Sequence, residues 1–441
     1  MVTEAPRPMI LPILLAFSFN LAHGADWPQW RGPNRDGVWS ETGIIDRFSE
    51  GQLKPVWRSP VASGYTGPTV AEGRIYVMDR STDPKQVERI QCFDQQTGAS
   101  LWSYTYDAIY RNVGYGAGPR ASVTIHKDRA YALGAMGHIH CLDAAKGNIL
   151  WSNDLFESYS IDLPIWGIAA APLIYDDLII LQIGGTPDAC IIALDRATGQ
   201  ERWRALSDKA SYAAPILTQQ AGKTVLIVWT GDSVAGLNPT TGALHWQHPH
   251  PPKRMIIGVA TPVAIDNHVL VTSFYDGALL LELATDRLAI SKVWHRVGEN
   301  ERDTDGIHST ISTPLWLGDH IYGIDSYGML RCLRADTGDR VWADSTAVRL
   351  ARWSTAHLIP QRGTDRIWIL NEEGELLLAR LSPQGFEVIS RTHIIEPTTD
   401  QLNRRGGVTW SHPAFANGHI YLRNGKELIA IDLRKSIDPK Q

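Results

Sequence analysis

The sequence predicts an all-β protein, a single eight-bladed β-propeller of four-stranded antiparallel blades that is closed by pairing of its N- and C-terminal strands. Three observations lead to this prediction. A short motif recurs at intervals of 43 to 52 residues. Short alternating strands surround each copy, and the two ends of the chain hold complementary parts of one incomplete unit. A period of about 40–50 residues with four short strands is typical of propeller blades.

The repeated motif consists of a small residue, an Asp, a Thr-Gly turn and a Trp, and it is clearest in ALDRATGQERW at residues 193–203. The Asp side chain closes such a turn on its own backbone, and the Gly supplies a positive φ. The Trp carries a large ring that can be buried against the next blade. The successive docking positions are Trp57, Trp102, Trp151, Trp203, Trp246, Trp294, Trp342 and the degraded Ile389.

One unit displays a whole predicted blade, with an inner strand at 311–317, further strands at 320–325 and 329–335, and an outermost strand at 340–344. Equivalent inner strands are expected to begin near Pro68, Val123, Pro172, Pro215, Pro262, Pro314, His357 and Pro413. The count of inner strands therefore predicts eight blades.

The two ends of the chain are expected to share one blade. The last unit, residues 413–432, has three strands, while the first strand, residues 54–60, stands alone. Pairing these parts removes two exposed strand edges. The predicted organisation is a lead segment at 25–52, one propeller domain at 53–434 and a tail at 435–441.

Residues 1–24 are expected to be a signal peptide. Arg7 precedes an apolar run at 10–22. Ala22 and Gly24 place small residues at the two positions that a signal peptidase recognises before its cleavage site. Thirteen residues are too short to cross a bilayer as a helix, so cleavage near Gly24 is favoured over an uncleaved anchor. The mature chain is expected to be periplasmic or secreted, with no transmembrane segment.

Composition is that of a soluble globular chain, with 44% hydrophobic and 20% charged residues. A formal net charge of −5 argues against a nucleic-acid partner. Although an exported protein can form disulfides, Cys92, Cys141 and Cys332 occupy a repeat position that holds Ala or Gly in other copies. Such a position favours a free, buried thiol acting as a small apolar filler.

A large side chain precedes each predicted inner strand, at the end of a linker from the previous blade. Eightfold geometry would bring these side chains together around the channel mouth, and linkers of 11 to 24 residues are the variable part of a repetitive scaffold, where binding usually resides. The candidate ligand-binding residues are Tyr65, Tyr115, Arg120, Trp166, Tyr212, Arg254, His308, Arg352, Trp353, Trp410 and His412.

Aromatic rings with guanidinium groups suit a planar anion, a quinone carboxylate or an extended peptide. The same residues would also serve to plug the channel by packing against one another. The sequence leaves both interpretations open.

Other motifs predict no catalytic residue and no metal site. Asp303 and Asp305 precede a Gly as in a calcium loop, but the later carboxylate is missing, which favours a solvated loop. The pairs His138 with His140 and His248 with His250 lack the further ligands that zinc needs. There is also no Gly-x-Ser-x-Gly elbow.

The repeat resembles the PQQ-like tryptophan-docking motif, of which residues 193–203 are a full copy. This motif is found in eight-bladed quinoprotein dehydrogenases and in the propeller subunit of the outer-membrane barrel-assembly machinery. The chain more closely resembles exported bacterial PQQ-like repeat proteins that begin with WPQWRGPNRDG, here at 27–37. Those proteins also carry stretches similar to HSTISTPLW at 308–316 and RWSTAHLIP at 352–360.

Two functions from different classes remain. The first is a non-catalytic exported scaffold that binds a protein, a peptide, an envelope component or a small anionic or aromatic ligand at the funnel face. The alternative, which the resemblance implies, is a PQQ-dependent oxidoreductase with quinone and calcium at the channel mouth. However, the adjacent cysteine pair of those dehydrogenases is absent, and no segment matches their calcium ligands or catalytic Asp. No catalytic residue is therefore carried over and no cofactor is assigned.

Overall fold

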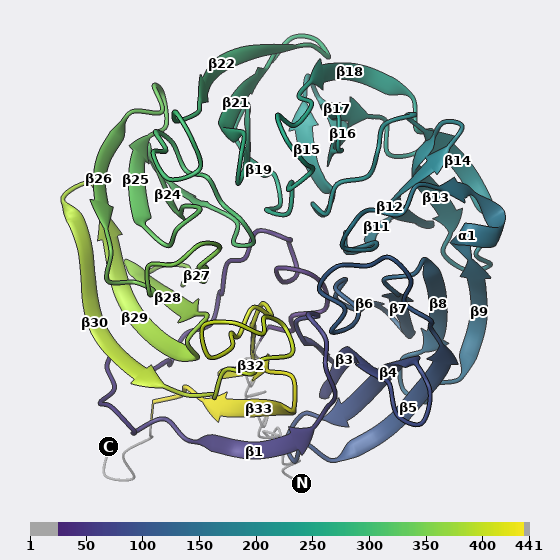
Figure 1. Cartoon of the computed structure of the whole chain (residues 1–441), viewed down its shortest axis with the longest axis horizontal. Coiled ribbons are helices and arrows are strands. Elements are labelled where there is room, and N and C mark those ends of the chain that lie inside the picture. The colour runs from purple at the N-terminus through teal and green to yellow at the C-terminus, as the bar shows by residue number, and fades with distance from the viewer. Residues whose placement is uncertain (1–24, 436–441) are drawn as a thin grey trace, which may run out of the picture.

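The computed structural model describes residues 25–435, and these residues form an eight-bladed β-propeller. Figure 1 looks down the ring, with the eight sheets arranged around a central channel. Each blade has four antiparallel strands in radial order, and one blade has an additional short strand. The predicted fold class and blade count are confirmed. The proposed signal peptide and all but the first residue of the proposed tail lie outside the described residues.

The first seven blades are each built from consecutive strands. Blade 1 contains β2 (Thr69–Ala71), β3 (Arg74–Ser81), β4 (Val87–Asp94) and β5 (Ser100–Asp107). Blade 2 contains β6 (Thr124–His126), β7 (Arg129–Leu133), β8 (His138–Asp143) and β9 (Ile149–Asp154). Blade 3 contains β11 (Leu173–Tyr175), β12 (Leu178–Thr186), β13 (Ala189–Asp195) and β14 (Glu201–Ala205). Blade 4 contains β15 (Ile216–Gln220), β16 (Lys223–Trp229), β17 (Ser233–Leu237) and β18 (Leu244–Pro249).

The remaining blades repeat the pattern. Blade 5 contains β19 (Val263–Ile265), β20 (His268–Ser273), β21 (Gly277–Leu283) and β22 (Ile290–Arg296). Blade 6 contains β23 (Leu315–Leu317), β24 (His320–Ile324), β25 (Leu330–Arg334) and β26 (Arg340–Asp344). Blade 7 contains β27 (Ala356–Pro360), β28 (Arg366–Asn371), β29 (Glu375–Ser382) and β30 (Gly385–His393).

Blade 8 closes the ring with strands from both ends of the chain. It contains β31 (Ala414–Ala416), β32 (His419–Arg423), β33 (Glu427–Asp432) and β1 (Pro55–Pro60). In Figure 1, β1 in purple lies beside β33 in yellow. The two strands are antiparallel, with Trp57 opposite Ala430 and Ser59 opposite Leu428. Closure therefore pairs strands about 370 residues apart in the sequence, as the sequence predicts.

The inner strands begin within one residue of the predicted starting positions, but the inner strand of blade 6 is shorter than the span predicted for it. In blade 6 the predicted inner strand began at Ile311, whereas β23 begins at Leu315. Ile311, in the part of the predicted strand that precedes β23, lines the pocket at the channel mouth instead.

One linker carries regular structure that the sequence did not predict. The linker after β9 forms the single helical turn α1 (Leu155–Ser158) and the short strand β10 (Ser160–Ile161), which pairs with β12. Asp154 caps the turn by accepting from the N–H groups of Phe156 and Glu157. No helix in residues 25–435 is both long and apolar enough to cross a membrane.

The repeated motif joins each blade to the next. Cys92 lies opposite Trp102, Cys141 opposite Trp151 and Ala193 opposite Trp203, so the small residue makes room for the ring across the strand pair. The indole N–H then donates to a carbonyl in the following blade, for example from Trp151 to Arg196 at 3.1 Å. Cys92, Cys141, Cys190 and Cys332 are all buried free thiols.

The lead segment crosses the face of the ring opposite the long linkers. Trp27 bridges Val70 of blade 1 through two backbone hydrogen bonds, and the N–H of Trp39 donates to Pro360 in blade 7. The buried Arg35 guanidinium donates to the carbonyls of Ala171 and Pro172, at 3.1 and 2.8 Å. Residues 25–39 therefore contact blades on several sides of the channel and cover its far end (Figure 1).

Candidate functional site

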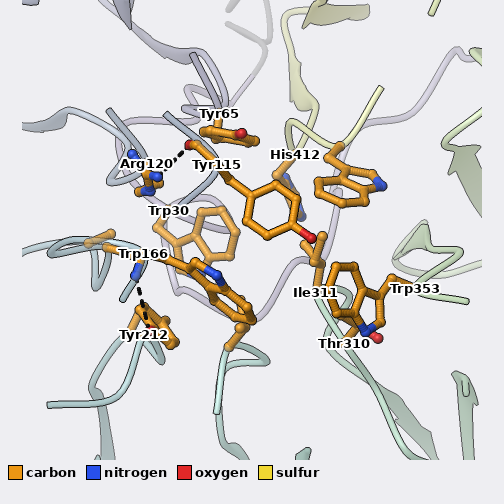
Figure 2. Close-up of a pocket in the computed structure, with 15 residues that line it drawn as sticks. Trp30, Tyr65, Tyr115, Arg120, Trp166, Tyr212, Thr310, Ile311, Trp353 and His412 are labelled. Atoms are coloured by element: carbon orange, nitrogen blue, oxygen red, sulfur yellow. Dashed lines mark hydrogen bonds between the residues drawn. The ribbon is translucent and has the colours of Figure 1, made fainter. Parts of the chain in front are cut away.

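The linkers between blades meet around a cavity of about 140 Å³ at the channel mouth, here called the funnel pocket (Figure 2). All eight linkers contribute at least one residue to its lining. The structure brings together eight of the eleven residues proposed from the sequence, namely Tyr65, Tyr115, Arg120, Trp166, Tyr212, Trp353, Trp410 and His412. The position before the inner strand thus converges on the pocket in six of the eight linkers.

The rings pack against one another as well as line the pocket. Tyr115 lies between the indoles of Trp166 and Trp353, with ring centroids 5.9 and 5.7 Å away in edge-on arrangements. Trp166 also contacts Tyr212, at 5.0 Å between centroids. Edge-on contacts of this kind are favourable for aromatic pairs. The rings therefore both line a pocket and fill part of the channel by packing against one another. The binding interpretation and the plug interpretation do not exclude each other.

Trp30 is a pocket residue that sequence reasoning missed. It comes from the lead segment, which covers the opposite end of the channel, so its indole forms the floor of the pocket. Its N–H donates to Thr261 Oγ1 at 2.8 Å, and its ring lies 5.0 Å from that of His412. Trp30 lies outside the repeat, and only its place in the WPQWRG stretch marks it in the sequence.

Small residues make room for the rings, and they too were missed. Ala169, Ala171, Ala214 and Val259 line the pocket between the aromatic side chains and the inner strands. They belong to runs such as IAAAP at 168–172 and YAAP at 212–215. The small-residue runs that end in Pro172 and Pro215 before two of the inner strands were the available signal.

Arg120 is the charged residue among those that line the pocket. Its guanidinium donates to the carbonyls of Gly114 at 2.9 Å and Tyr115 at 2.6 Å, and also to the carbonyl of Gly118. It lies over the ring of Tyr65, with 5.0 Å between Cζ and the centroid. These contacts use the guanidinium to hold a loop, so little of its donor capacity faces the pocket.

His412 lines the pocket, and His357 packs against it with 4.8 Å between ring centroids. Burial lowers the pKa of His357 to about 4, and burial together with His357 and Arg31 lowers the pKa of His412 well below its ordinary value. His357 donates from Nε2 to the carbonyl of Trp410 at 3.0 Å, because a carbonyl oxygen can only accept. The pocket floor is therefore uncharged at neutral pH.

Trp410 is held by a carboxylate that the sequence did not indicate. Glu372, which is fully buried, accepts from Trp410 Nε1 at 2.9 Å and from Ser354 Oγ at 3.0 Å. Arg405 lies 3.3 Å from the same carboxylate. Burial raises the pKa of Glu372, and the hydrogen bonds with Trp410 and Arg405 nearby oppose that rise.

Three proposed residues lie outside the pocket lining. Arg352 forms a two-point ion pair with Glu301, at 2.9 and 3.0 Å, and that bonding raises its pKa. Arg254 is exposed and lies 4.0 Å from Glu301. His308 is buried, with Nδ1 3.0 Å from the carbonyl of Phe274.

The weaker candidates of the sequence do not assemble into a metal centre. Within residues 25–435, no group of three or more His, Cys, Asp or Glu side chains is placed to hold a metal ion. His140 packs against Tyr106, with 4.2 Å between ring centroids, and burial lowers its pKa to about 4. His250 packs against His295 at 5.2 Å, and burial likewise lowers its pKa to about 4.

Comparison with known proteins identifies similar sequences for part of the chain. A family model described as outer membrane protein assembly factor BamB matches residues 86–344. The 1-butanol dehydrogenase (quinone) of Thauera butanivorans is 28% identical over 162 residues, which are 34% of this chain and 25% of that protein. The chain thus matches about a quarter of the length of such curated relatives.

Two solved structures share the fold. BamB from Moraxella catarrhalis superposes with a TM-score of 0.58 at 15% identity, covering 86% of this chain and 99% of that one. Quinohemoprotein alcohol dehydrogenase from Comamonas testosteroni superposes with a TM-score of 0.64 at 13% identity, covering 94% and 82% of the two chains. At such low identity the likeness is one of fold.

Proposed function

The chain belongs to the family of the outer membrane protein assembly factor BamB, and from this premise we propose that it is a non-catalytic scaffold that captures a partner protein at the funnel face. The partner would insert an aromatic or apolar side chain into the funnel pocket. The observation that carries this proposal is the convergence of aromatic side chains from six of the eight linkers on one small, mostly uncharged cavity. Anchor residues buried in such pockets dominate many protein interfaces.

The surroundings of the pocket support a protein partner. Ile165 and Leu350, on two of the linkers that form the pocket, are 55% and 52% exposed. Exposed apolar side chains grouped around a pocket are typical of protein interaction sites. The volume of about 140 Å³ matches a single side chain better than a drug-sized ligand, which needs about 300 Å³ or more.

The quinone alternative is supported by the similarity to quinone-dependent dehydrogenases, but the pocket residues do not fit pyrroloquinoline quinone. That cofactor carries three carboxylates, whereas the lining supplies one guanidinium, and Arg120 already donates to three backbone carbonyls. Burying unpaired carboxylates among aromatic rings would cost several kcal/mol each. We therefore favour the scaffold over the quinone-dependent oxidoreductase.

The proposal also includes export of the protein to the periplasm or the medium. The apolar run at 10–22 and the small residues Ala22 and Gly24 support cleavage of a signal peptide and a periplasmic or secreted scaffold. The partner would then be an envelope protein or peptide, consistent with the outer-membrane assembly named in the family description.

Site-specific photo-crosslinking in cells tests the proposal. A benzophenone amino acid at Ile165 should give a discrete adduct with the partner. The same probe at Val341, an exposed apolar position on the outer strand β26, should give none. The adduct at Ile165 should be lost in Trp353→Ala and retained in the control Trp316→Ala, because Trp316 is a partly buried indole of β23 outside the pocket. Equal adducts at Ile165 and Val341 would refute binding at the funnel face.

A second measurement addresses the alternative. Absorption of the purified protein after addition of pyrroloquinoline quinone and calcium should show no retained cofactor after gel filtration. Stoichiometric retention that depends on Arg120 would instead support the oxidoreductase.

A further inference from the structure

Tyr115 occupies the middle of the funnel pocket in a backbone conformation that favours glycine. Its φ is 54°, in the left-handed region, which is costly for a residue with an aromatic side chain. Figure 2 shows its ring at the centre of the pocket, surrounded by the other labelled side chains. Strain of this kind persists only where surrounding contacts impose it, and it is concentrated at functional sites.

The loop that carries Tyr115 is rich in glycine and is held through its backbone. The carbonyls of Tyr115 and Gly116 accept hydrogen bonds from Arg120 and Arg80, both at 2.6 Å. Gly114, Gly116 and Gly118 surround the tyrosine in the sequence. Gly114 N–H donates to the carbonyl of Ile165 at 2.7 Å. By contrast, a Cβ on Gly116 would meet one atom within 4 Å, at 3.9 Å. Moving Tyr115 out of the pocket therefore requires the loop to give up the hydrogen bonds from Arg120 and Arg80, and the neighbouring glycines supply the backbone freedom for that movement.

The Tyr115 ring fills part of the pocket and packs against its aromatic lining. It contacts Trp166, Trp353 and Trp410 at centroid distances of 5.7 to 6.2 Å. Its hydroxyl accepts a hydrogen bond from the exposed Arg404 at 3.2 Å. Its side chain is half-buried.

With Tyr115 in place, two buried polar atoms of the lining have no partner. These atoms are the indole N–H of Trp353 and the hydroxyl of Thr310, which is 6% exposed. In Figure 2 both residues lie on the same side of the pocket. Buried polar groups without partners are rare and unfavourable. A ligand with an aromatic body and a polar tip would satisfy them.

We propose that Tyr115 is an internal occupant of the funnel pocket and that the partner displaces it with an aromatic side chain carrying a hydrogen-bonding tip, as tyrosine does. The inference rests on the proposed function and adds the class of side chain that is recognised. Displacement relieves the strained φ and provides a partner for Trp353 or Thr310. Because binding must first expel Tyr115, the apparent affinity of the intact protein is reduced by the fraction of molecules in which the pocket is filled.

Titration of the purified protein with N-acetyl-L-tyrosinamide, followed by tryptophan fluorescence and calorimetry, tests this. Tyr115→Gly, which suits the positive φ and empties the pocket, should bind about tenfold more tightly than the wild type. N-acetyl-L-phenylalaninamide should bind Tyr115→Gly about fivefold more weakly than the tyrosine amide, because it leaves the polar atoms unpaired. Adding Trp353→Ala to Tyr115→Gly should abolish binding.

Asn112→Gly is the matched control. Asn112 also has a positive φ, of 57°, and lies exposed on the same linker without entering the pocket. Asn112→Gly should bind the tyrosine amide as the wild type does. Tighter binding in Tyr115→Gly alone would then result from removal of the ring from the pocket and not from a more flexible loop. Tyr115→Ala provides a second cleared variant, and melting temperatures verify that all variants are folded.

Two outcomes would overturn the inference. If Tyr115→Gly binds no better than the wild type while binding still requires Trp353, Tyr115 is a wall of the site, and the proposed function stands. If no variant binds either amide, the aromatic ligand class is wrong, and the Ile165 crosslink decides the proposed function separately.

Discussion

The indole of Trp102 lies on Gly147, the turn glycine of the next blade, so closely that a Cβ on Gly147 would be 2.5 Å from Trp102 Cδ2. Trp102 Nε1 also donates to the carbonyl of Ala144 in the same turn at 3.1 Å. The glycine therefore has two roles, since it supplies a φ of +73° and offers a flat surface for the ring. The same contact recurs for Trp57 on Gly98, Trp151 on Gly199 and Trp203 on Gly242.

The first prediction separates these two roles. Gly147→Ala should lower the free energy of unfolding by about 2–5 kcal/mol, from left-handed strain of about 1–2 kcal/mol and overpacking of about 1–3 kcal/mol. Urea unfolding monitored by tryptophan fluorescence would measure the change.

Gly73→Ala is the matched control. Gly73 has almost the same φ, +74°, but a Cβ there would meet no atom within 4 Å. The free energy of unfolding of Gly73→Ala should therefore fall only by the backbone strain of about 1–2 kcal/mol. Equal losses for the two variants would show that the contact with Trp102 is unimportant.

The fold could be predicted because its determinants are local and repeated. The turn glycine and the tryptophan of one motif are four residues apart, and each contacts its counterpart in a neighbouring blade, so one motif reports many contacts. The funnel pocket was predictable to the same extent, since Trp166 and Tyr212 follow the repeat.

The rest of the site depends on features that do not repeat. Trp30 reaches the pocket from the lead segment and bonds Thr261, 231 residues away. The direction of each side chain could not be predicted from the sequence either. Trp353 adopts a φ of 69° and lines the pocket, whereas the adjacent Arg352 pairs with Glu301. Sequence position alone does not specify which of two neighbouring side chains faces the channel.

The second prediction concerns the buried carboxylate behind Trp410. Glu372→Ala should lower the free energy of unfolding by about 3–5 kcal/mol, because it leaves Trp410 Nε1, Ser354 and Arg405 without their acceptor. Thermal unfolding followed by circular dichroism would measure it.

The adjacent Glu373 supplies the comparison. Glu373 is partly exposed, and its Oε1 lies 3.8 Å from Nε of Arg349. Exposed pairs contribute about 0–1 kcal/mol, so Glu373→Ala should change the stability little. A small effect of Glu372→Ala would mean that the carboxylate is dispensable for the blade 7 linker.

The third prediction is a pH dependence. The pKa of His357 is about 4 in the folded protein, below the ordinary value of about 6.5. Between these values the unfolded chain binds more protons than the folded one, so stability falls as pH decreases from about 6.5 to 4. His357 alone should account for about 2–3 kcal/mol of that loss.

His357→Gln tests the assignment, because glutamine is neutral and keeps a donor for the Trp410 carbonyl. Its melting temperature, measured from pH 4 to 7, should fall less steeply than that of the wild type. His320→Gln, at a partly exposed position of β24, should leave the slope unchanged. Parallel curves for wild type and His357→Gln would exclude His357 as the acid-sensitive group.

The last prediction concerns the four thiols. Burial raises the pKa of Cys92 to about 12 and that of Cys141 and Cys332 to about 11, and it also raises the pKa of Cys190. Since the thiolate is the reactive form, a disulfide reagent such as DTNB at pH 8 should not label the native protein. In guanidinium chloride, all four thiols should react.

The same reaction reports opening of the blade contacts. Cys92 lies directly opposite Trp102 on the neighbouring strand, and Trp102 is the ring that packs on Gly147. Gly147→Ala should therefore speed labelling of Cys92 under native conditions by weakening the cover over it, whereas Gly73→Ala should not. Rapid labelling of Cys92 in the wild type would contradict the tight packing of Trp102 between the first two blades. Mass spectrometry of the labelled peptides would assign the reactive thiol.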